Sequence, residues 1–503
     1  MDPWTILSTI LVGAVVLYLF YVRNYSYFKR HGIPYVTPLP IFGNMAKVVF
    51  KKESIMHAIQ RSYKLNPDAK YVGFYYFGTP VILLRDPELL KLIAIKHFDV
   101  FPNRKMFADF PAEPLLRRTL FTLHDDEWRT MRSLLSPAFS AGKMKMMFEM
   151  VRECGTNFGE YMANRRVQPE GFDMKDVLKR YTLDVIASTA FGLSTNSLEE
   201  RDNKFYEVGV KVTDFFSYLQ IIRVFILRSF PSVARLFNIK FVDGESANFF
   251  KNVMKNTIET RDREGIVRPD MIHLLMQARD KQVKWTPTLD DMTAQGLMFL
   301  MAGLEGSTTA MCFVAQILAL EPEVQKKLHA EIDEVLKENP ERVSYEQINA
   351  MKYLEAVISE SLRVFTTNFL VDRVCTEEFT LPPALPGLEP LRIQPSQNLW
   401  IPIYSIHRDE KNFPNPDKFD PERFSDENKS NFNSSAYIPF GLGPRICVAS
   451  RYALMLVKLA IFNLLAKCDL LPGTKTHPRI EYKTDAFALE PQGGFWLKVQ
   501  PRK

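Results

Sequence analysis

Cysteine is scarce in this sequence, which has five in 503 residues and no Cys-x-x-Cys pair. This spacing excludes a zinc ribbon and a disulfide-stabilised scaffold, so most of the thiols are expected to be reduced and buried. Glycine (22 residues) and proline (32 residues) are too few for a collagen-like chain. With 46% hydrophobic residues, the chain is too apolar to be disordered and can bury a large core.

Positive charge is not concentrated either. The sequence has 64 Lys and Arg residues against 58 Asp and Glu, a net charge of +6, and this excess is spread along the chain. A nucleic-acid-binding stripe is therefore excluded, and a membrane surface or an acidic protein is the more compatible partner. No glycine-rich flavin or dinucleotide fingerprint follows a predicted strand, so a redox reaction would need a separate electron donor.

An uncharged, mainly apolar run extends from Pro3 to Val22. Twenty helical residues span about 30 Å, the thickness of the hydrocarbon core of a bilayer. Tyrosines cluster at the end of this run and basic residues follow it, which orients the rest of the chain toward the cytosol. A cleaved signal peptide would instead have a basic start and a shorter apolar stretch. We predict a single transmembrane anchor at residues 1–22 and a basic, proline-rich connector at residues 23–44.

Residues 45–503 contain no internal repeat and no long polar linker, so we expect one large domain. The clearest helix starts at Thr288, where Asp291 completes a capping-box variant, and continues to Leu320. Two further helices are predicted at 348–365 and 452–466, a hairpin at 71–77 and 81–85, and proline-rich irregular chain at 382–421. The predicted class is mainly α with a small β portion.

The most informative segment is Phe440-Gly441-Leu442-Gly443-Pro444-Arg445-Ile446-Cys447. Two glycines and a proline predict a tight loop, and Cys447 stands where an apolar helix begins. Unpaired N–H groups and the positive end of the helix dipole favour a thiolate there, and Arg445 adds positive charge. Such a thiolate, seven residues after an aromatic side chain, suits an axial ligand of haem iron.

This segment resembles the haem-ligand loop of the cytochrome P-450 haem-thiolate superfamily, Phe-x-x-Gly-x-Arg-x-Cys. The resemblance continues in the same order along the whole chain. It implies the cytochrome P-450 fold, a thiolate-ligated haem (iron protoporphyrin IX) and Cys447 as the metal ligand. Leu135-Ser136-Pro137-Ala138-Phe139 is most similar to the microsomal insect detoxification and vertebrate drug-oxidising branches.

Other motifs carry the same resemblance. Glu360-Ser361-Leu362-Arg363 and the segment Phe419–Phe424 are similar to the Glu-x-x-Arg and Pro-x-Arg-Phe motifs, which implies a buried ion-paired triad of Glu360, Arg363 and Arg423. Trp128-x-x-x-Arg132 resembles a helix whose Trp and Arg share one face and can reach a haem propionate. The residues implied to contact the haem are Arg104, Trp128, Arg132, Ala302, Gly303, Arg373, Phe440, Arg445 and Cys447.

The segment Ala302–Gly306 resembles the oxygen-activation segment of the family, Ala-Gly-x-acid-Thr. Glu305 fills the acid position, which implies a proton relay, but the threonine position holds Gly306. The hydroxyl of the family's threonine helps hold dioxygen and its protons, so that hydrogen peroxide does not escape. Gly306 leaves space for water, and Ser307 is rotated by about 100° and does not simply replace the hydroxyl. A substrate hydroxyl or water serves instead, catalysis is poorly coupled, or the reaction needs no dioxygen activation.

The substrate pocket is implied by resemblance alone, and its aromatic side chains suit a lipophilic molecule. The segments implied to line it are Phe107–Phe110, Phe215–Tyr218, Phe299–Glu305, Thr366–Leu370 and Phe487. Residues 225–241 mix apolar and basic side chains and are either a bilayer contact or an ordinary amphipathic segment. Arg129 and Lys458 are predicted on a basic face that docks an acidic reductase.

The first functional hypothesis is a single-pass monooxygenase of the endoplasmic reticulum membrane, with its catalytic domain in the cytosol. It would insert one oxygen atom of O2 into a lipophilic xenobiotic, lipid or hormone. Electrons would come from an NADPH-dependent flavoprotein reductase, with a b-type cytochrome as a further partner. Gly306 keeps two alternatives open: a haem-thiolate isomerase or dehydratase of hydroperoxides, and a catalytically weak haem protein that binds ligands.

Overall fold

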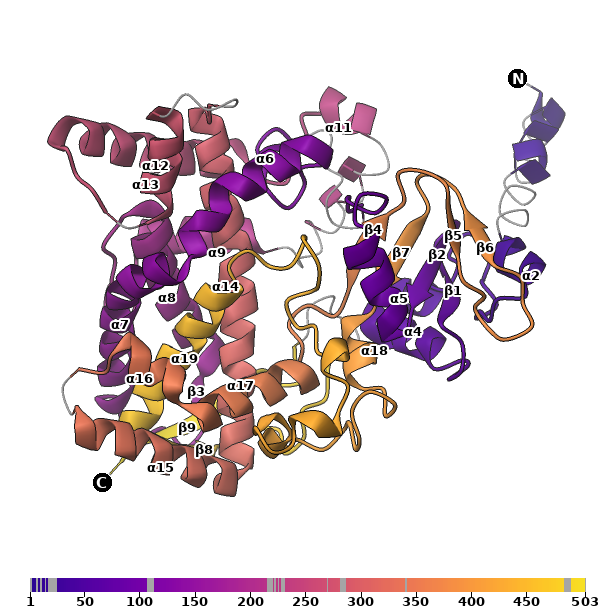
Figure 1. The fold of residues 1–503 in the computed structure, drawn as a ribbon. Coiled ribbons are helices and arrows are strands. Elements are labelled where there is room, and N and C mark those ends of the chain that lie inside the picture. The colour runs from indigo at the N-terminus through magenta and orange to yellow at the C-terminus, as the bar shows by residue number, and fades with distance from the viewer. Residues whose placement is uncertain are drawn as a thin grey trace.

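The computed structural model describes residues 2–5, 8–9, 11–13, 15–16, 25–105, 113–214, 220, 223–224, 226–227, 231–268, 270–280, 286–339, 342–483 and 490–502. Over these residues the chain is mainly helical with three small sheets, which confirms the predicted class. Figure 1 shows two sides: a large helical side and a smaller side built around the four-stranded sheet.

The helical side of Figure 1 contains the long helices of the chain. Their bounds are α6 (Asp125–Leu135), α7 (Ala141–Ala163), α8 (Met174–Ile186), α9 (Lys204–Thr213), α12 (Gly244–Glu264), α13 (Met271–Asp280), α14 (Leu289–Leu320), α15 (Pro322–Glu338), α16 (Tyr345–Ala350), α17 (Lys352–Val364) and α19 (Ser450–Lys467). The remaining described helices are short: α2 (Tyr27–Arg30), α3 (Ala46–Val49), α4 (Ile55–Tyr63), α5 (Pro87–Lys91), α11 (Pro231–Leu236) and α18 (Ile403–His407).

The largest sheet has the strand order β1-β2-β7-β4, in which β2 and β7 are parallel and the other pairs antiparallel. The predicted hairpin is confirmed, with Tyr71 opposite Leu84 and a turn at Phe77 and Gly78. The strand bounds are β1 (Tyr71–Tyr76), β2 (Thr79–Leu84), β3 (Phe172–Asp173), β4 (Val371–Val374), β5 (Phe379–Leu381), β6 (Leu391–Ile393), β7 (Asn398–Ile401), β8 (Cys468–Pro472) and β9 (Trp496–Pro501).

Helix α14 is the central helix of the helical side and begins where the sequence predicts. Thr288 is its N-cap: the Thr288 Oγ1 accepts the N–H of Asp291 at 3.2 Å, and the Asp291 carboxylate accepts the N–H of Thr288 at 3.0 Å. The N-terminal half packs in one apolar cluster, up to Leu304, and the C-terminal half packs in another, from Ala310 onward. The segment predicted to handle oxygen therefore lies where the helix passes between two cores.

Two predictions of secondary structure are wrong in part. The helix expected at 348–365 is two helices, α16 and α17, which are separated at Met351. The carboxylate of Glu331, on α15, accepts the N–H groups of Tyr353 and Leu354 at 2.8 Å each, and so caps α17 from another helix. The stretch 382–421, expected to be irregular, contains β6, β7 and α18, because β7 pairs with strands from distant parts of the chain.

The predicted membrane anchor is described only in part. Its described residues between Pro3 and Val16 are helical and exposed, and they project from the sheet side in Figure 1. The prediction for residues 17–22 lies outside the described residues. Among the described residues, one helix is long and apolar enough to cross a membrane, α14, and most of its apolar stretch is buried inside the protein. Burial therefore identifies α14 as a core helix, although its length and composition alone would allow a membrane span.

Candidate functional site

The loop that carries Cys447 is closed by its own main chain. The N–H of Cys447 donates to the carbonyl of Phe440 at 3.0 Å, and the N–H of Ile446 donates to that of Gly443 at 2.9 Å. Gly443 has a φ of +72°, and a Cβ there would collide with the carbonyl oxygen of Ala94, so glycine is required. Helix α19 begins at Ser450, two residues earlier than predicted, and leaves Cys447 just before its N-cap, Ala449.

The protein environment alone does not favour the thiolate, contrary to the expectation from the helix dipole. Cys447 is exposed, but the protein around it removes enough water for burial to raise the pKa of its thiol. The N–H of Ala449 and the guanidinium groups of Arg132 and Arg104 lower this pKa without reversing the shift. Arg445, the expected source of positive charge, is not among these influences. A bound metal ion would lower this pKa further, because its positive charge favours the thiolate.

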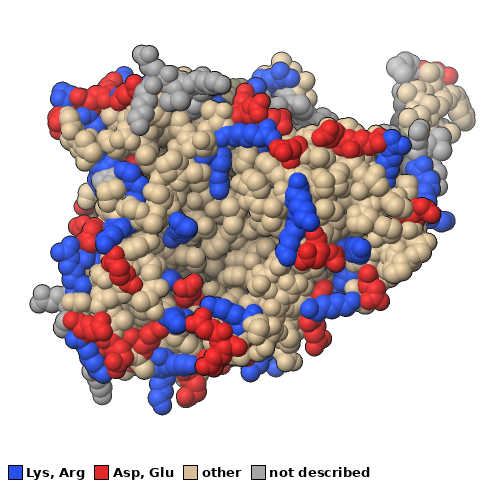
Figure 2. Space-filling view, in the orientation of Figure 1, with Lys and Arg blue, Asp and Glu red and all other residues tan. Residues whose placement is uncertain are grey.

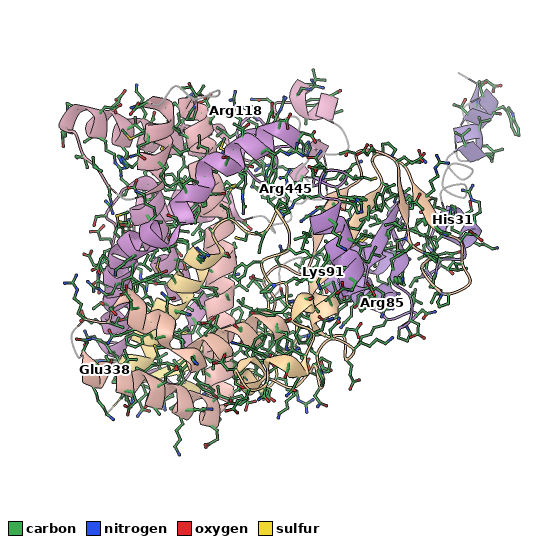
Figure 3. All side chains as sticks on the ribbon, in the orientation of Figure 1. His31, Arg85, Lys91, Arg118, Glu338 and Arg445 are labelled. Carbon is green, nitrogen blue, oxygen red and sulfur yellow. The ribbon has the colours of Figure 1, made fainter. Side chains whose placement is uncertain are left out.

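Three of the predicted arginines form a cluster beside this loop. Arg373, on β4, is fully buried and donates to the main-chain oxygens of Asp372 (2.8 Å) and Leu442 (3.1 Å). Arg445 is also buried and donates to the main-chain oxygens of Pro102 (2.8 Å) and Leu123 (2.9 Å). Arg104 Nη2 donates to the carbonyl of Arg445 at 2.9 Å. Figure 3 shows Arg445 between the helical side and the sheet side.

The arginine cluster carries more positive charge than the chain itself neutralises. Burial and the charge of Arg104 lower the pKa of Arg373 to about 9, and burial with the charges of Arg104 and Arg373 lowers the pKa of Arg445 to about 8. The Nε atoms of Arg104 and Arg373 are buried and have no hydrogen-bond partner among the described residues. Two carboxylates of a bound group would supply both missing interactions. The residues present therefore fit a haem with its two propionates.

Helix α6 contacts the Cys447 loop through Trp128 and Arg132. The guanidinium of Arg445 lies 4.1 Å from the centre of the Trp128 ring, and Arg132 Nη1 donates to the carbonyl of Ile446 at 2.8 Å. Because these two residues are four positions apart, they share one face of α6. The structure thus brings this pair together with Arg445, as the sequence motif implies.

The three residues of the expected triad meet at the C-terminal end of α17. Glu360 and Arg363 have no exposed side-chain surface, and Arg363 Nε lies 2.7 Å from Glu360 Oε2. Arg423 Nε lies 3.5 Å from the same oxygen and is nearly buried. Arg363 also donates to the carbonyls of His407, Pro416 and Lys418. The triad therefore connects α17 to the chain that leads to the Cys447 loop.

Along α14, the predicted catalytic positions face different ways. Glu305 forms a short ion pair with Lys179 and lies 3.8 Å from Lys175, both on α8. Gly306 borders open space, since a Cβ there would meet no atom within 4 Å. Ser307, the next residue, is buried. Ala302 is exposed although most of α14 is buried, and a Cβ at Gly303 would lie 3.1 Å from Ile186 on α8.

Some segments predicted to line the substrate pocket lie outside the described residues, and the described ones include buried and half-buried side chains. Phe107–Phe110, Phe487 and residues 215–218 lie outside the described residues. Phe299 is half-buried and its ring lies 5.4 Å from that of Phe139. Thr366 is fully buried, and Phe369 and Thr367 are half-buried.

The predicted redox-docking pair is wrong at Lys458. This residue is only 4% exposed, because α19 is buried, and its ammonium pairs with Glu355 at 3.4 Å. Arg129 is exposed, but it pairs with Asp99 (2.7 Å) and Asp126 (2.9 Å). In Figure 2, acidic and basic side chains alternate around a broad uncharged area on the face shown.

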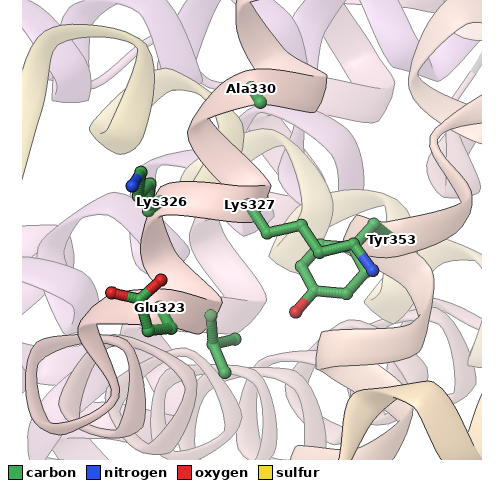
Figure 4. A pocket seen from close by; sticks show the side chains of 6 residues that line it. Glu323, Lys326, Lys327, Ala330 and Tyr353 are labelled. Atoms are coloured by element: carbon green, nitrogen blue, oxygen red, sulfur yellow. The ribbon is translucent and has the colours of Figure 1, made fainter.

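A shallow surface hollow between α15 and α17 shares no residue with the predicted site. Figure 4 shows its lining, in which the Lys327 ammonium lies 4.3 Å from the Tyr353 ring centre and also pairs with Glu422. We assign this hollow no function.

Asn103 is a site residue that the sequence analysis missed. Its side chain exchanges two hydrogen bonds with Asp125 at the start of α6 (2.9 and 3.0 Å), and its carbonyl accepts the N–H of Val374 on β4 at 3.0 Å. It therefore joins the segments that carry Arg104, Trp128 and Arg373. The sequence feature that could have identified Asn103 is its position directly before Arg104.

Comparisons with known proteins agree with this geometry. Residues 33–497 match the family model described as cytochrome P450. The chain is 39% identical to cytochrome P450 9e2 of Blattella germanica, with 99% of this chain and 98% of the relative covered. It is 36% identical to probable cytochrome P450 9f2 of Drosophila melanogaster (99% of both) and 32% identical to cytochrome P450 6j1 of Blattella germanica (98% and 97%).

Proposed function

Since this chain belongs to the cytochrome P450 family, whose members are monooxygenases that bind thiolate-ligated haem, we propose that it oxidises a lipophilic small molecule at the endoplasmic reticulum membrane. One atom of O2 enters the substrate, and a separate NADPH-dependent flavoprotein reductase provides the electrons. The observation that carries this proposal is the cluster of Arg104, Arg373 and Arg445 beside the Cys447 loop.

The residues of the Cys447 loop would hold the haem. The bound haem supplies the iron that activates dioxygen, with electron density from the thiolate. Cys447 is the proposed ligand, and the positive charge of the metal favours the thiolate that burial disfavours. Arg104, Arg373 and Arg445, with Trp128 and Arg132 on α6, would neutralise and orient the propionates.

The chain's proposed part in catalysis lies on α14. Glu305 is held by the lysines of α8 and would take up and release protons. Gly306 provides no hydroxyl, and the open space beside it has room for a water molecule or a substrate hydroxyl. Either one could donate the hydrogen bond that threonine provides elsewhere in the family.

The described N-terminal residues support a membrane anchor. Trp4 is 74% exposed and Leu11 is 65% exposed on a helix, an arrangement that favours burial in lipid. The hydroxyls of Ser8 and Thr9 donate to main-chain oxygens of Trp4 and Thr5 at 2.7 Å, which satisfies them within the helix. We propose a single span with the catalytic domain in the cytosol.

Ferrous–carbonyl spectra of the membrane-bound protein test the proposal. The wild type should show the strongly red-shifted Soret band of thiolate ligation, and Cys447→Ala should abolish it. Cys154→Ala, on α7, is the matched control and should keep the band. A wild-type spectrum without the shifted band would overturn the haem-thiolate assignment.

The open space at Gly306 favours a second candidate, an isomerase or dehydratase of hydroperoxides, which needs neither O2 nor a reductase. Turnover of a fatty-acid hydroperoxide without NADPH, together with no reductase-dependent product, would favour this candidate. Product formation that requires both NADPH and reductase would exclude it.

A further inference from the structure

Five charged side chains form a continuous row from α14 to the C-terminal part of the chain. Lys179 pairs with Glu305, Lys175 lies 3.8 Å from the other oxygen of Glu305, and Lys175 also makes a short ion pair with Glu490. Lys483 lies 3.0 Å from Glu490 and completes the row. We call this set the Glu490–Glu305 ion-pair chain. It joins segments that are up to 315 positions apart in the sequence.

Secondary structure positions both ends of this ion-pair chain: helix α8 carries its lysines near Glu305, and paired main chains carry Lys483 and Glu490. Lys175 and Lys179 are four residues apart and therefore share a face of α8, which packs against α14. The main chain of Lys483 donates to the carbonyl of Glu490 at 2.9 Å, so the two residues face each other across paired chains. An antiparallel bridge between Tyr482 and Pro491 continues this pairing. Glu490 is thus presented to Lys175 by a supported backbone.

The charges within the Glu490–Glu305 ion-pair chain shift the pKa values of its members. Burial raises the pKa of Glu490, but the charges of Lys175 and Lys483 outweigh burial and hold this pKa below its ordinary value. Burial lowers the pKa of Lys175, yet Glu305 and Glu490 together raise it above its ordinary value. Lys175 is therefore shared between two carboxylates, and its short contact is with Glu490 rather than with Glu305.

We propose that Glu490 is a positioning residue for Glu305: by holding Lys175, it leaves Glu305 with Lys179 as its close cationic partner. This inference rests on the proposed function, in which Glu305 moves protons toward the reacting oxygen. A carboxylate held by two close lysines would give up its negative charge less readily and would accept a proton less often. Glu490 therefore keeps Glu305 able to exchange protons.

Among the described residues, Asp173 and Cys312 are further ionisable groups close to these side chains. Asp173 is the N-cap of α8 and accepts the N–H of Lys175 at 3.0 Å. Cys312, two turns after Glu305 on α14, is fully buried, and burial raises the pKa of its thiol well above the ordinary value, so it stays neutral. Neither group competes with Glu490 for the Lys175 ammonium.

Charge-removing variants of Glu490 and Lys175 should have opposite effects on the stability of the Glu305 carboxylate. In Glu490→Gln, a negative charge is lost and Lys175 is free to approach Glu305, and both changes stabilise the Glu305 carboxylate. In Lys175→Gln a positive charge is lost, and this loss destabilises the Glu305 carboxylate. In the double variant Lys175 is absent, so the loss of Glu490 should have little further effect and the double variant should resemble Lys175→Gln. A purely structural role would instead make both single variants and the double variant worse in the same direction.

Infrared titration of the purified haem protein measures this directly. The protonated carboxyl band that disappears in Glu305→Gln identifies Glu305. Its midpoint should move down by about one pH unit in Glu490→Gln and up by about as much in Lys175→Gln, and in the double variant it should stay close to that of Lys175→Gln. Glu170→Gln, which removes an exposed pair with Lys475, is the control and should leave it unchanged. A midpoint that stays constant or moves up in Glu490→Gln would overturn the proposal.

A second measurement separates this inference from the proposed function. With NADPH and reductase but no organic substrate, hydrogen peroxide released per NADPH should rise about threefold or more in Glu490→Gln, and in the double variant it should stay close to that of Lys175→Gln. If Glu305→Gln leaves peroxide release unchanged, the proton role of Glu305 in the proposed function fails. The infrared midpoints would still decide whether Glu490 acts on Glu305.

Discussion

Arg363 and Glu360 form a salt bridge of 2.7 Å in which neither side chain is exposed to solvent. Arg423 adds a contact of 3.5 Å to the same carboxylate, and Glu360 Oε1 accepts the N–H of Asp420 at 2.9 Å. The pair is therefore part of a buried network that connects α17 with the chain before the Cys447 loop. Each member depends on the others, because a buried charge without its partner is costly.

Replacement of Glu360 by Ala should destabilise the protein by about 3–5 kcal/mol, because it leaves two buried guanidinium groups without their carboxylate. Urea unfolding and the amount of haem retained after purification measure this loss. Glu346→Ala, which removes an exposed pair with Lys145, is the control and should have little effect on stability. Equal losses in the two variants would contradict the structural role of the triad.

Gly306→Thr should fold normally and reduce the hydrogen peroxide released per NADPH several-fold. A Cβ at this position meets no atom within 4 Å, and threonine is preferred over glycine inside a helix by about 0.3 kcal/mol. Gly303→Thr is the matched control: its Cβ would lie 3.1 Å from Ile186, so it should lower the thermal midpoint. Unchanged peroxide release in a folded Gly306→Thr would show that a hydroxyl at this position does not improve coupling.

Glu113 should make stability depend on pH. Its carboxylate is 2% exposed and accepts the N–H of Phe241 at 2.8 Å, and burial raises its pKa above the ordinary value of 4.5. As pH rises, the unfolded chain loses this proton first, so the contribution of Glu113 is most favourable below pH 4.5 and is lost as pH rises through the folded pKa. Glu113→Gln keeps an acceptor for Phe241 and should therefore become more stable relative to wild type between about pH 4 and pH 7.

Urea unfolding of wild type and Glu113→Gln at several pH values measures this difference. The exposed Glu427→Gln is the control and should follow the wild type at each pH. A stability difference that does not grow with pH would refute the role of burial at Glu113.

Membrane attachment should depend on two regions. Deletion of residues 1–22 should release part of the protein from vesicles in carbonate buffer. The remainder should require Leu236 and Phe237, which are 78% and 69% exposed at the end of α11, next to Arg235. Replacing both by Asp in the deletion variant should release it further. Val267→Asp, at an equally exposed apolar position between α12 and α13, should not do so. Full attachment of the deletion variant that also carries both Asp substitutions would contradict a bilayer contact at α11.

Short-range patterns predicted several elements correctly. The Thr288–Asp291 capping box predicted the start of α14, and the β-branched and aromatic runs on either side of Gly78-Thr79-Pro80 predicted the β1–β2 hairpin. These elements are predictable because their hydrogen bonds join residues that are close in the sequence. The family resemblance of their motifs also identified Glu360, Arg363 and Arg423, which the structure places in contact.

Contacts between distant segments were not predictable in the same way. Glu331 caps α17 from another helix, and Lys458 is buried against Glu355 although nothing near it in the sequence indicates this. The partners of Glu305 come from α8, and one of them, Lys175, also pairs with Glu490 in the C-terminal region. A local pattern specifies that a carboxylate is present on a helix, but its charge balance depends on which side chains the packed chain brings within about 4 Å. For this protein, the family and the proposed haem ligand follow from residue order, whereas the electrostatics around Cys447 and Glu305 arise only when remote segments pack together and exclude water.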